Sequence, residues 1–224
     1  MNKAIKLLIL IILSLSVYFI YQNTKQSKIK ILSFGDSLSL GINSYGYREY
    51  GYIDYYKDYL DTTKDVELLN YSKEDMTIHE LLESIKTNPK IKRDLLESHI
   101  LIINIGFNDI IYKTNLEENI SPSKINKISK EIETEYNNLL KEINKYYKNK
   151  IIVVGYPKLN SDNYYYNIGI RNLNKYLEKN NNITYIDTYK LLSNREKYFS
   201  NPNSYYPNRK GYLKISKELI NIDL

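Results

Sequence analysis

Short apolar runs alternate with segments of helical periodicity along most of the chain, and this alternation constrains the fold more than any other feature. The expected strands are Ile29–Phe34, Val66–Leu69, His99–Ile105, Ile151–Val154 and Ile183–Ile186. Apolar spacing and capping residues predict helices over Tyr47–Leu60, Thr77–Ile85, Pro89–Glu97, Ser121–Lys148, Tyr164–Lys179 and Pro207–Ile222. Such alternation is typical of a parallel sheet covered by helices on both faces. The sequence therefore predicts one α/β domain over residues 29–224, with a five-stranded parallel sheet.

Residues 1–28 form a separate N-terminal segment. The apolar run Leu7–Tyr21, extended to residue 4, approaches the roughly 20 residues that a membrane span needs. The one small-x-small cleavage motif, Ser14–Ser16, lies inside this run. An uncleaved membrane anchor through residues 4–21 is therefore favoured over a cleaved signal peptide. We expect a single span in the cell membrane and a domain outside the cytoplasm, and secretion is the less favoured alternative. The lysines on the two sides of the apolar run are balanced, so their distribution defines the orientation of the span only weakly.

The distribution of charge argues against a nucleic-acid partner. The formal net charge is +6, but four of these charges are lysines among the first 28 residues, where no acid occurs. The remainder thus carries +2, and no basic stripe interleaved with aromatic residues is present in the sequence. The lack of cysteine excludes disulfides, thiolate chemistry and lipid attachment through an N-terminal cysteine. Without metal-ligand spacing or a phosphate-binding glycine loop, we expect no cofactor and no metal.

Two motifs place polar side chains directly after strands. In Gly35–Leu38 (GDSL), a serine follows the first strand, where a tight turn presents its hydroxyl at the carboxyl edge of the sheet. In Gly106–Asp109 (GFND), Asn108 follows the third strand and reaches the same edge. An amide and backbone N–H groups aimed at one point are what an oxyanion hole requires. The pattern predicts Ser37 as nucleophile; taken alone, GDSL is equally compatible with a serine that caps a helix.

These two motifs, together with Pro207–Tyr212 (PNRKGY), resemble the blocks of the SGNH, or GDSL, hydrolase superfamily in order and spacing. The resemblance covers residues 29–224. It implies a flavodoxin-like three-layer α/β/α sandwich and ester hydrolysis in a cleft at the surface. It also implies that Gly106 and Asn108 belong to the oxyanion region, and that substrates are small esters, lipids, acylated sugars or cell-wall polymers.

The last blocks depart from the family pattern. The family's Asp-x-x-His-Pro block reads NSYYP at residues 203–207, so Asn203 stands at the acid position and Tyr206 at the base position. The glycine of the second oxyanion donor aligns with Asp75, and Ser72 is the less certain alternative. Tyr206 is a poor base, because about one tyrosine in a thousand is phenolate at neutral pH. It can still hydrogen-bond the serine and hold it in place.

The two histidines offer little replacement for the missing base. His99 begins the third strand, roughly 20 Å from the motif at the other end at about 3.3 Å per residue. His79 lies on the correct side, two residues after Thr77, and is the one imidazole placed to approach Ser37. A histidine early in a helix more often points at solvent, and this is the interpretation we favour.

Two functions remain open on the sequence. The first is a membrane-anchored ester hydrolase, such as a deacylase of cell-wall or surface glycans, with a degenerate catalytic site. The second is a catalytically inactive pseudoenzyme that keeps the cleft to bind an acylated or carbohydrate ligand or a partner protein. The retained Ser37 and Asn108 favour the first; Asn203, Tyr206 and Asp75 favour the second. The oligomeric state stays open.

Overall fold

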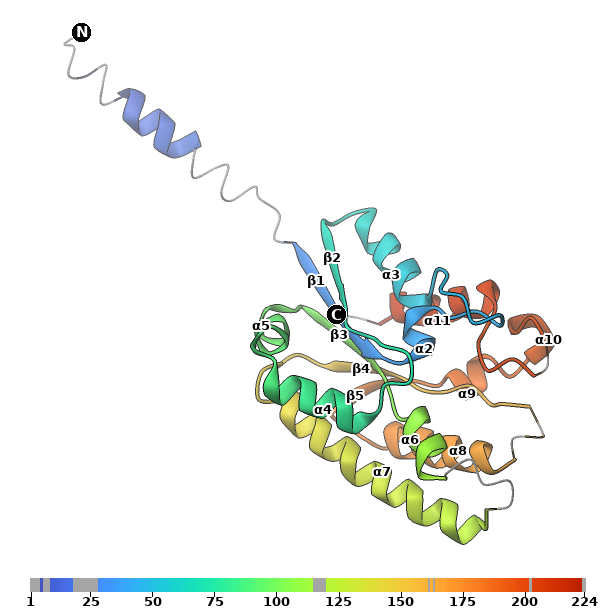
Figure 1. Ribbon diagram of the computed structural model, residues 1–224. Coiled ribbons are helices and arrows are strands. Elements are labelled where there is room, and N and C mark those ends of the chain that lie inside the picture. Colours follow the sequence, from blue (N-terminus) through green and yellow to red (C-terminus); the bar gives the residue numbers. More distant parts are fainter. Residues whose placement is uncertain are drawn as a thin grey trace.

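A computed structural model describes residues 5, 9–17, 28–114, 120–160, 162, 164–201 and 203–222, with elements labelled as in Figure 1. The strands are β1 (Ile29–Gly35), β2 (Val66–Asn70), β3 (Ile100–Asn104), β4 (Ile151–Val154) and β5 (Ile183–Ile186). The longer helices are α3 (Tyr52–Asp61), α4 (Ile78–Thr87), α5 (Pro89–Glu97), α7 (Pro122–Ile143), α8 (Tyr164–Glu178) and α11 (Arg209–Ile220). The short ones are α2 (Ser37–Leu40), α6 (Phe107–Lys113), α9 (Thr188–Leu191) and α10 (Arg195–Tyr198).

The five strands form one sheet in the order β2-β1-β3-β4-β5, and every neighbouring pair is parallel. The chain moves outward from β1 to β2, then crosses back over β1 to β3 and continues in the other direction. The reversal between β1 and β3 is a topological switch point, where open parallel sheets form a crevice at the carboxyl ends of the strands. This order confirms the predicted flavodoxin-like α/β architecture.

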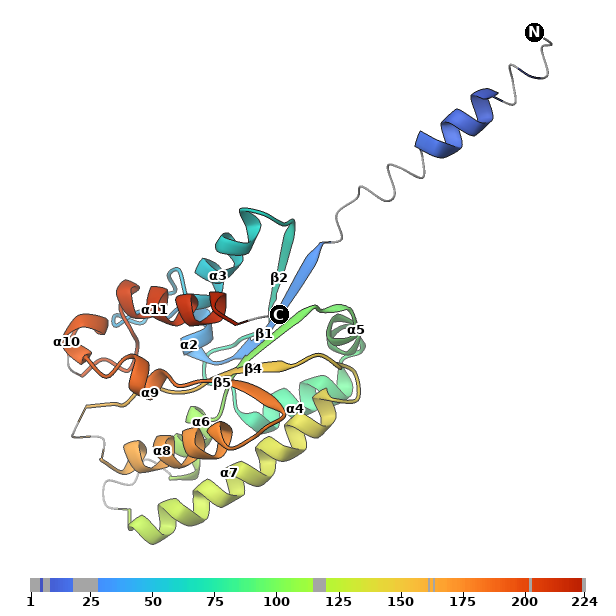
Figure 2. The same cartoon turned by 180° about the vertical axis from the view of Figure 1, so that it is seen from behind.

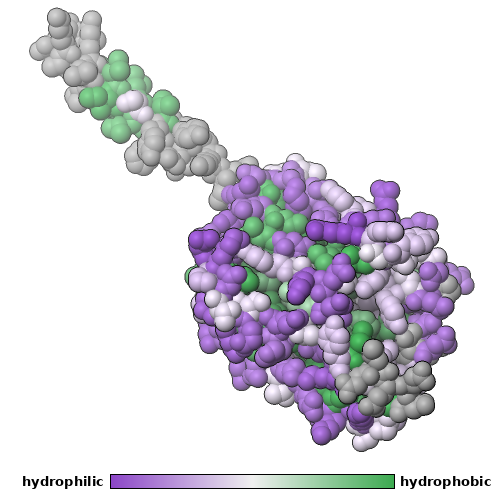
Figure 3. Space-filling view, in the orientation of Figure 1, coloured by the Kyte–Doolittle hydropathy of each residue, from purple (hydrophilic) through white to green (hydrophobic). Residues whose placement is uncertain are grey.

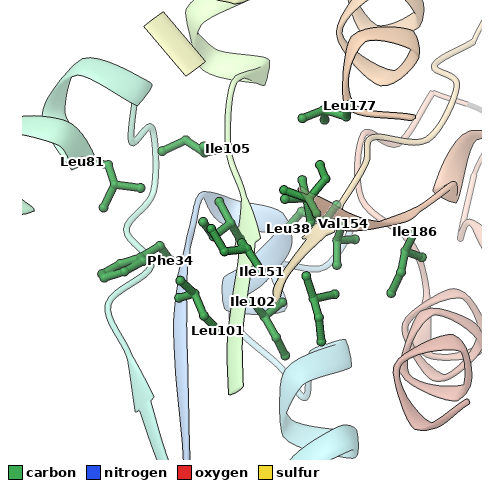
Figure 4. Close-up of a cluster of buried hydrophobic side chains, with 14 of the residues drawn as sticks. Phe34, Leu38, Leu81, Leu101, Ile102, Ile105, Ile151, Val154, Leu177 and Ile186 are labelled. Atoms are coloured by element: carbon green, nitrogen blue, oxygen red, sulfur yellow. The ribbon is translucent and has the colours of Figure 1, made fainter. Parts of the chain in front are cut away.

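Helices cover both faces of the sheet. Helices α3 and α11 pack together on one face, whereas α4, α7 and α8 pack in a row on the other (Figures 1 and 2). The central strand β3 is buried along its whole length, as expected of a strand covered on both faces. Around it lie Phe34 of β1, Ile151 of β4 and Ile186 of β5 (Figure 4). This continuous apolar core fixes the strand ends that carry the site.

The predicted helix over Tyr47–Leu60 is wrong in its first turn. Helix α3 begins at Tyr52, because Gly51 is extended and its N–H donates to Asp54 at 2.8 Å. Residues before it fold back instead, and Ile42 and Arg48 form an antiparallel bridge. Helical spacing of apolar residues does not reveal this bridge, which closes a local turn through Gly46 at φ +80°.

The ends of two other helices also differ from expectation. The final helix begins at Arg209, not at Pro207, which pairs with Phe199 in an antiparallel bridge. The predicted helix over Ser121–Lys148 ends early, at Ile143. By contrast, the capping box of α4 is present: Thr77 caps the helix, and its N–H donates to the Glu80 carboxylate at 2.9 Å.

At the N-terminus, residues 9–17 are helical and almost all of their side chains are apolar and exposed. Figure 3 shows them as a green rod, whereas the visible face of the domain is mainly purple and white. None of the helices in the described part of the chain is long and apolar enough to cross a membrane. The rest of the predicted anchor, residues 4–21, lies mostly outside the described residues.

Candidate active site

A pocket opens at the carboxyl edge of the sheet, beside the switch point between β1 and β3. It brings together Ser37, Asn108 and Tyr206 from three distant parts of the chain. Its lining consists of Asp36, Ser37, Leu38, Phe107, Asn108, Tyr156, Pro157, Leu159, Ile170, Tyr205 and Tyr206. The free volume is about 20 Å³, room for about one water molecule. Apolar and aromatic side chains make up most of the lining, and Asp36, Ser37 and Asn108 add polar groups to the tyrosine hydroxyls.

Ser37 is the first residue of the short helix α2, and its side chain is 7% exposed. Asp36 caps this helix by accepting from the N–H of Leu38 at 3.0 Å. Gly35 precedes it, and a Cβ there would lie 2.2 Å from the Ser39 hydroxyl. Only glycine permits so tight a turn, which fixes the serine at the end of β1.

Asp36 lies under the pocket and is almost fully buried. One carboxylate oxygen accepts from Leu38, and the other accepts from the Tyr156 hydroxyl. Burial raises the pKa of Asp36 to about 7, and the two hydrogen bonds only partly oppose this. Both oxygens are engaged away from the serine, so the carboxylate holds the turn in place and is not aimed at Ser37.

Asn108 lies in the first turn of α6 and is 8% exposed. Its Nδ2 donates to the Met76 carbonyl at 3.1 Å, which leaves its second amide proton for a ligand. Gly106 precedes the helix with φ +119°, a region that favours glycine. The neighbouring Asp109 accepts from the Ile78 N–H at 3.1 Å, and burial raises its pKa to about 6. These bonds tie the GFND motif to the loop that carries Asp75.

Asp75 has φ +58° and is the one non-glycine residue with positive φ in the described part of the chain. A position in this conformation favours glycine, as the alignment with a family glycine implies. Asp75 is exposed and does not line the pocket, but its charge helps to raise the pKa of Tyr206. Ser72, the alternative, is half-buried in the same loop and also lies outside the lining.

Tyr206 is half-buried beside the serine. Burial raises its pKa above the ordinary value of 10, and the charges of Asp36 and Asp75 act in the same direction. Hydrogen bonding with the Ser37 hydroxyl opposes the shift only in part. Its backbone is held by Ser204, whose hydroxyl donates to the Tyr206 carbonyl at 2.7 Å. Because the pKa is raised, even less of Tyr206 is phenolate at neutral pH than in free tyrosine, and a protonated phenol cannot take the serine's proton.

Asn203 does not join the pocket. It is exposed, and its side-chain oxygen accepts from Asn160 Nδ2 at 2.8 Å. Neither histidine lines the pocket: His79 is exposed on α4. His99 lies at the opposite edge of the sheet, where its Nδ1 accepts from the Lys30 N–H at 3.1 Å. Among the described residues, no group of three or more metal-binding side chains gathers.

The sequence analysis missed the aromatic wall of the pocket. Phe107 packs between Tyr156 and Tyr205, with ring centroids 5.5 and 6.2 Å away. Tyr156 lies two residues after β4, so the rule that pointed to Ser37 and Asn108 applies to it as well. The chain has 25 tyrosines, however, so the residue type alone does not single out Tyr156 as a site residue.

The flavodoxin-like sheet, with a serine after β1 and an asparagine after β3, is the arrangement expected of the GDSL class. The family model of the GDSL-like lipases and acylhydrolases matches residues 31–219. This chain belongs to that family. Comparison with curated protein sequences gives no match.

Solved structures share the fold over nearly the whole domain. The lipase Lip_vut3 from a goat rumen metagenome is 22% identical, with a TM-score of 0.70 over 86% of this chain and 96% of that one. A G-D-S-L family protein from Veillonella parvula is 16% identical, with a TM-score of 0.62 over 88% and 98%. Axe2, an acetylxylan esterase from Geobacillus stearothermophilus, is 18% identical, with a TM-score of 0.60 over 87% and 95%. At these identities the likeness concerns the fold.

Proposed function

We propose that this protein is a membrane-anchored ester hydrolase that removes short acyl groups from surface glycans, with a degenerate and slow catalytic site. The observation that carries the proposal is the shared pocket of Ser37 and Asn108 at the switch point of the sheet. The apolar lining supports a short acyl group, and the aromatic wall around Tyr205 supports stacking against a sugar ring. One neighbour in fold is an acetylxylan esterase.

In this reaction the Ser37 oxygen attacks the acyl carbonyl carbon, and the Asn108 amide donates a hydrogen bond to the oxyanion. Water relays the serine's proton to the leaving sugar oxygen as the ester C–O bond breaks, which releases the sugar hydroxyl. A second water then hydrolyses the acyl-serine to the carboxylic acid and the free serine hydroxyl. Tyr206 positions the serine, but burial keeps its phenol protonated at neutral pH. Loss of a triad member costs about 10⁴-fold, with roughly 10³ over water left from the oxyanion hole and binding. We therefore expect slow turnover.

A second function, ligand binding without hydrolysis, is favoured by a specific observation. Asn203 turns toward Asn160, and Tyr206 has a raised pKa, so neither replaces the acid and base of a triad. In that case the pocket recognises an acylated or carbohydrate ligand and leaves its ester intact.

Labelling with a fluorophosphonate distinguishes the two functions, because this probe bonds only to an activated serine. The full chain in detergent is expected to label slowly, and Ser37→Ala to lose all labelling. Ser123→Ala, an exchange of an exposed serine on α7 that lies outside the pocket lining, is the matched control and should label like the native chain. No labelling above the Ser37→Ala background would refute hydrolysis and leave the binding function.

The anchor through residues 4–21, with the domain outside the cytoplasm, is part of the same proposal. The exposed apolar side chains of residues 9–17 support it, since such a surface is unfavourable in water. The full chain is expected to stay with membranes after alkaline extraction and to enter solution in detergent. A secreted form that begins after Tyr21 would show a cleaved signal peptide instead.

A further inference from the structure

The amino edge of the sheet lies opposite the pocket and carries a concentration of lysines. Because all five strands are parallel, the turns that precede them meet at this one edge. Lys28 precedes β1, Lys64 precedes β2, Lys148 and Lys150 precede β4, and Lys179 precedes β5. All five side chains belong to exposed residues. We call these five residues the lysine face.

The positive charge of the lysine face is largely uncompensated. Within the described part of the chain, four of its members form no ion pair, and Lys28 lies 3.9 Å from Asp65. Most other acids near this edge are paired with lysines outside the lysine face: Asp61 with Lys57, Glu97 with Lys30, Glu142 with Lys145 and Glu178 with Lys190. Glu67 on β2 forms no ion pair within the described residues. Five lysines against Asp65 and Glu67 leave the lysine face with an excess of positive charge.

A groove of about 420 Å³ lies in the same edge. Its lining includes the aliphatic residues Ile29, Leu60, Ile100 and Ile222 and the lysines Lys64 and Lys150. Aliphatic side chains flanked by ammonium groups match an anionic phospholipid, which has a negatively charged headgroup and apolar acyl chains beneath it. The rest of the lining is Ile152 and the polar residues His99, Asn149 and Thr184, which can hydrogen-bond the oxygens of a headgroup.

The chain enters the domain at this edge, since Lys28 leads directly into β1. Only six residues, 22–27, separate it from the apolar run. Even fully extended, such a connection reaches roughly 25 Å. If residues 4–21 lie in a bilayer, the amino edge stays within this distance of the lipid surface. The pocket lies beyond the length of the sheet on the other side.

We propose that the lysine face docks on the anionic phospholipid headgroups of the membrane that holds residues 4–21. Docking turns the Ser37 pocket away from the bilayer, toward polymers outside it, so the substrates are surface glycans and not membrane lipids. This inference rests on the proposed anchor. Raising the ionic strength weakens docking, because the Debye length falls from about 10 Å at 0.1 M to about 3 Å at 1 M.

The experiment uses the full chain inserted in vesicles with nitroxide-labelled headgroups. The chain has no cysteine, so one introduced cysteine carries the only fluorophore. Asn181→Cys reports from the amino edge, and Tyr45→Cys, at a side chain 77% exposed, reports from the carboxyl edge. In phosphatidylglycerol vesicles, the 181 reporter should be quenched more strongly than the 45 reporter. In phosphatidylcholine vesicles, or at 1 M salt, the difference should shrink.

Charge-reversal variants identify the face. Each lysine at an anionic surface changes the docked-to-undocked ratio by roughly fivefold, so Lys64→Glu/Lys148→Glu/Lys150→Glu should abolish the preference of the 181 reporter. The matched control is Lys73→Glu/Lys158→Glu/Lys197→Glu, which changes the net charge by the same amount at the opposite edge. In this variant the 181 reporter should still be quenched more strongly than the 45 reporter. Equal quenching of both reporters in anionic vesicles, or equal effects of the two variants, overturns the inference.

Flotation with phosphatidylcholine vesicles tests the anchor alone, since this lipid carries no net charge. A chain that does not float overturns the anchor and the docking with it. Fluorophosphonate labelling of Ser37 in the same sample then still reports on hydrolysis. A chain that floats but shows no preferred orientation overturns the docking and leaves the anchor intact.

Discussion

The two edges of the sheet hold polar residues in opposite ways. At the carboxyl edge, Asp36, Ser37 and Asn108 are each less than a tenth exposed, and hydrogen bonds hold them between strand ends. At the amino edge, lysines such as Lys64 and Lys150 stand in water. Burying a carboxylate raises its pKa and costs stability, whereas a solvated lysine costs almost nothing. The buried polar groups at the carboxyl edge thus lower the stability of the fold and form a defined pocket. The exposed lysines at the amino edge remain accessible to a partner.

The largest expected effect concerns Asp36. Its pKa is about 7 in the folded protein and 3.8 ordinarily, so between about pH 4 and pH 7 the folded state holds a proton that the unfolded state has lost. Its contribution to stability is therefore present at low pH and lost as pH rises through 7, by about 4 kcal/mol in total. Urea unfolding from pH 5 to pH 8 should show a decline that Asp36→Asn largely removes.

A native profile that matches the Asp36→Asn profile would show that the carboxylate is not buried as described. Asp109→Asn provides the comparison within the same edge. Because burial raises the pKa of Asp109 only to about 6, its own contribution is lost at lower pH, between about pH 4 and pH 6.

The second-largest effect is expected on the rate of ester hydrolysis when the missing base is restored. Tyr206 lines the same pocket as Ser37, so an imidazole at this position lies near the serine. Tyr206→His with Asn203→Asp is expected to raise kcat/KM for a small activated acetyl ester by at least about 10²-fold, a fraction of the 10⁴ that a triad member supplies. Single substitutions should give less, because Asn203 now bonds Asn160 and must turn to orient a histidine.

Two controls accompany the double variant. Adding Ser37→Ala should abolish the gain, and His99→Tyr, at the amino edge, should leave the native rate unchanged. A double variant that folds normally and is no faster would show that position 206 does not place a base beside the serine.

The sequence predicted the arrangement of the carboxyl edge better than its details. Strand runs such as Ile151–Val154 and the motifs that follow them are local signals, and the parallel sheet brings them to one edge. The contact between Asp36 and Tyr156 joins residues 120 apart, and no local pattern encodes it. The start of α3 was missed for another reason: a local turn closed by the bridge between Ile42 and Arg48 precedes it, and the apolar spacing masks this turn. Burial, and hence every pKa shift at the site, follows from such tertiary contacts.

The third effect concerns backbone strain, which within the described residues occurs outside glycine only at Asp75. Asp75→Gly is expected to stabilise the protein by about 0.5–1 kcal/mol, because glycine adopts φ near +58° without a Cβ clash. The matched change at the amino edge, Asp65→Gly, should destabilise it by a similar amount through backbone entropy. Urea midpoints of the two variants should thus move in opposite directions; movement in the same direction would contradict the strained backbone.

The smallest effect is expected at the lysine face. Lys64→Glu/Lys148→Glu/Lys150→Glu should change the free energy of unfolding by no more than about 0.5 kcal/mol, because all three residues are exposed and form no ion pair within the described part of the chain. Lys148 Nζ does donate to the Asn144 carbonyl at the end of α7, which is worth a few tenths of a kcal/mol.

Urea unfolding in detergent measures this value without a charged lipid surface. The same variant should lose its orientation on phosphatidylglycerol vesicles, so stability and docking separate in one protein. A loss of more than about 2 kcal/mol would instead mean that the lysines hold the fold together, since exposed charges rarely contribute so much. The contrast between a strained, buried carboxyl edge and a freely charged amino edge would then have to be abandoned.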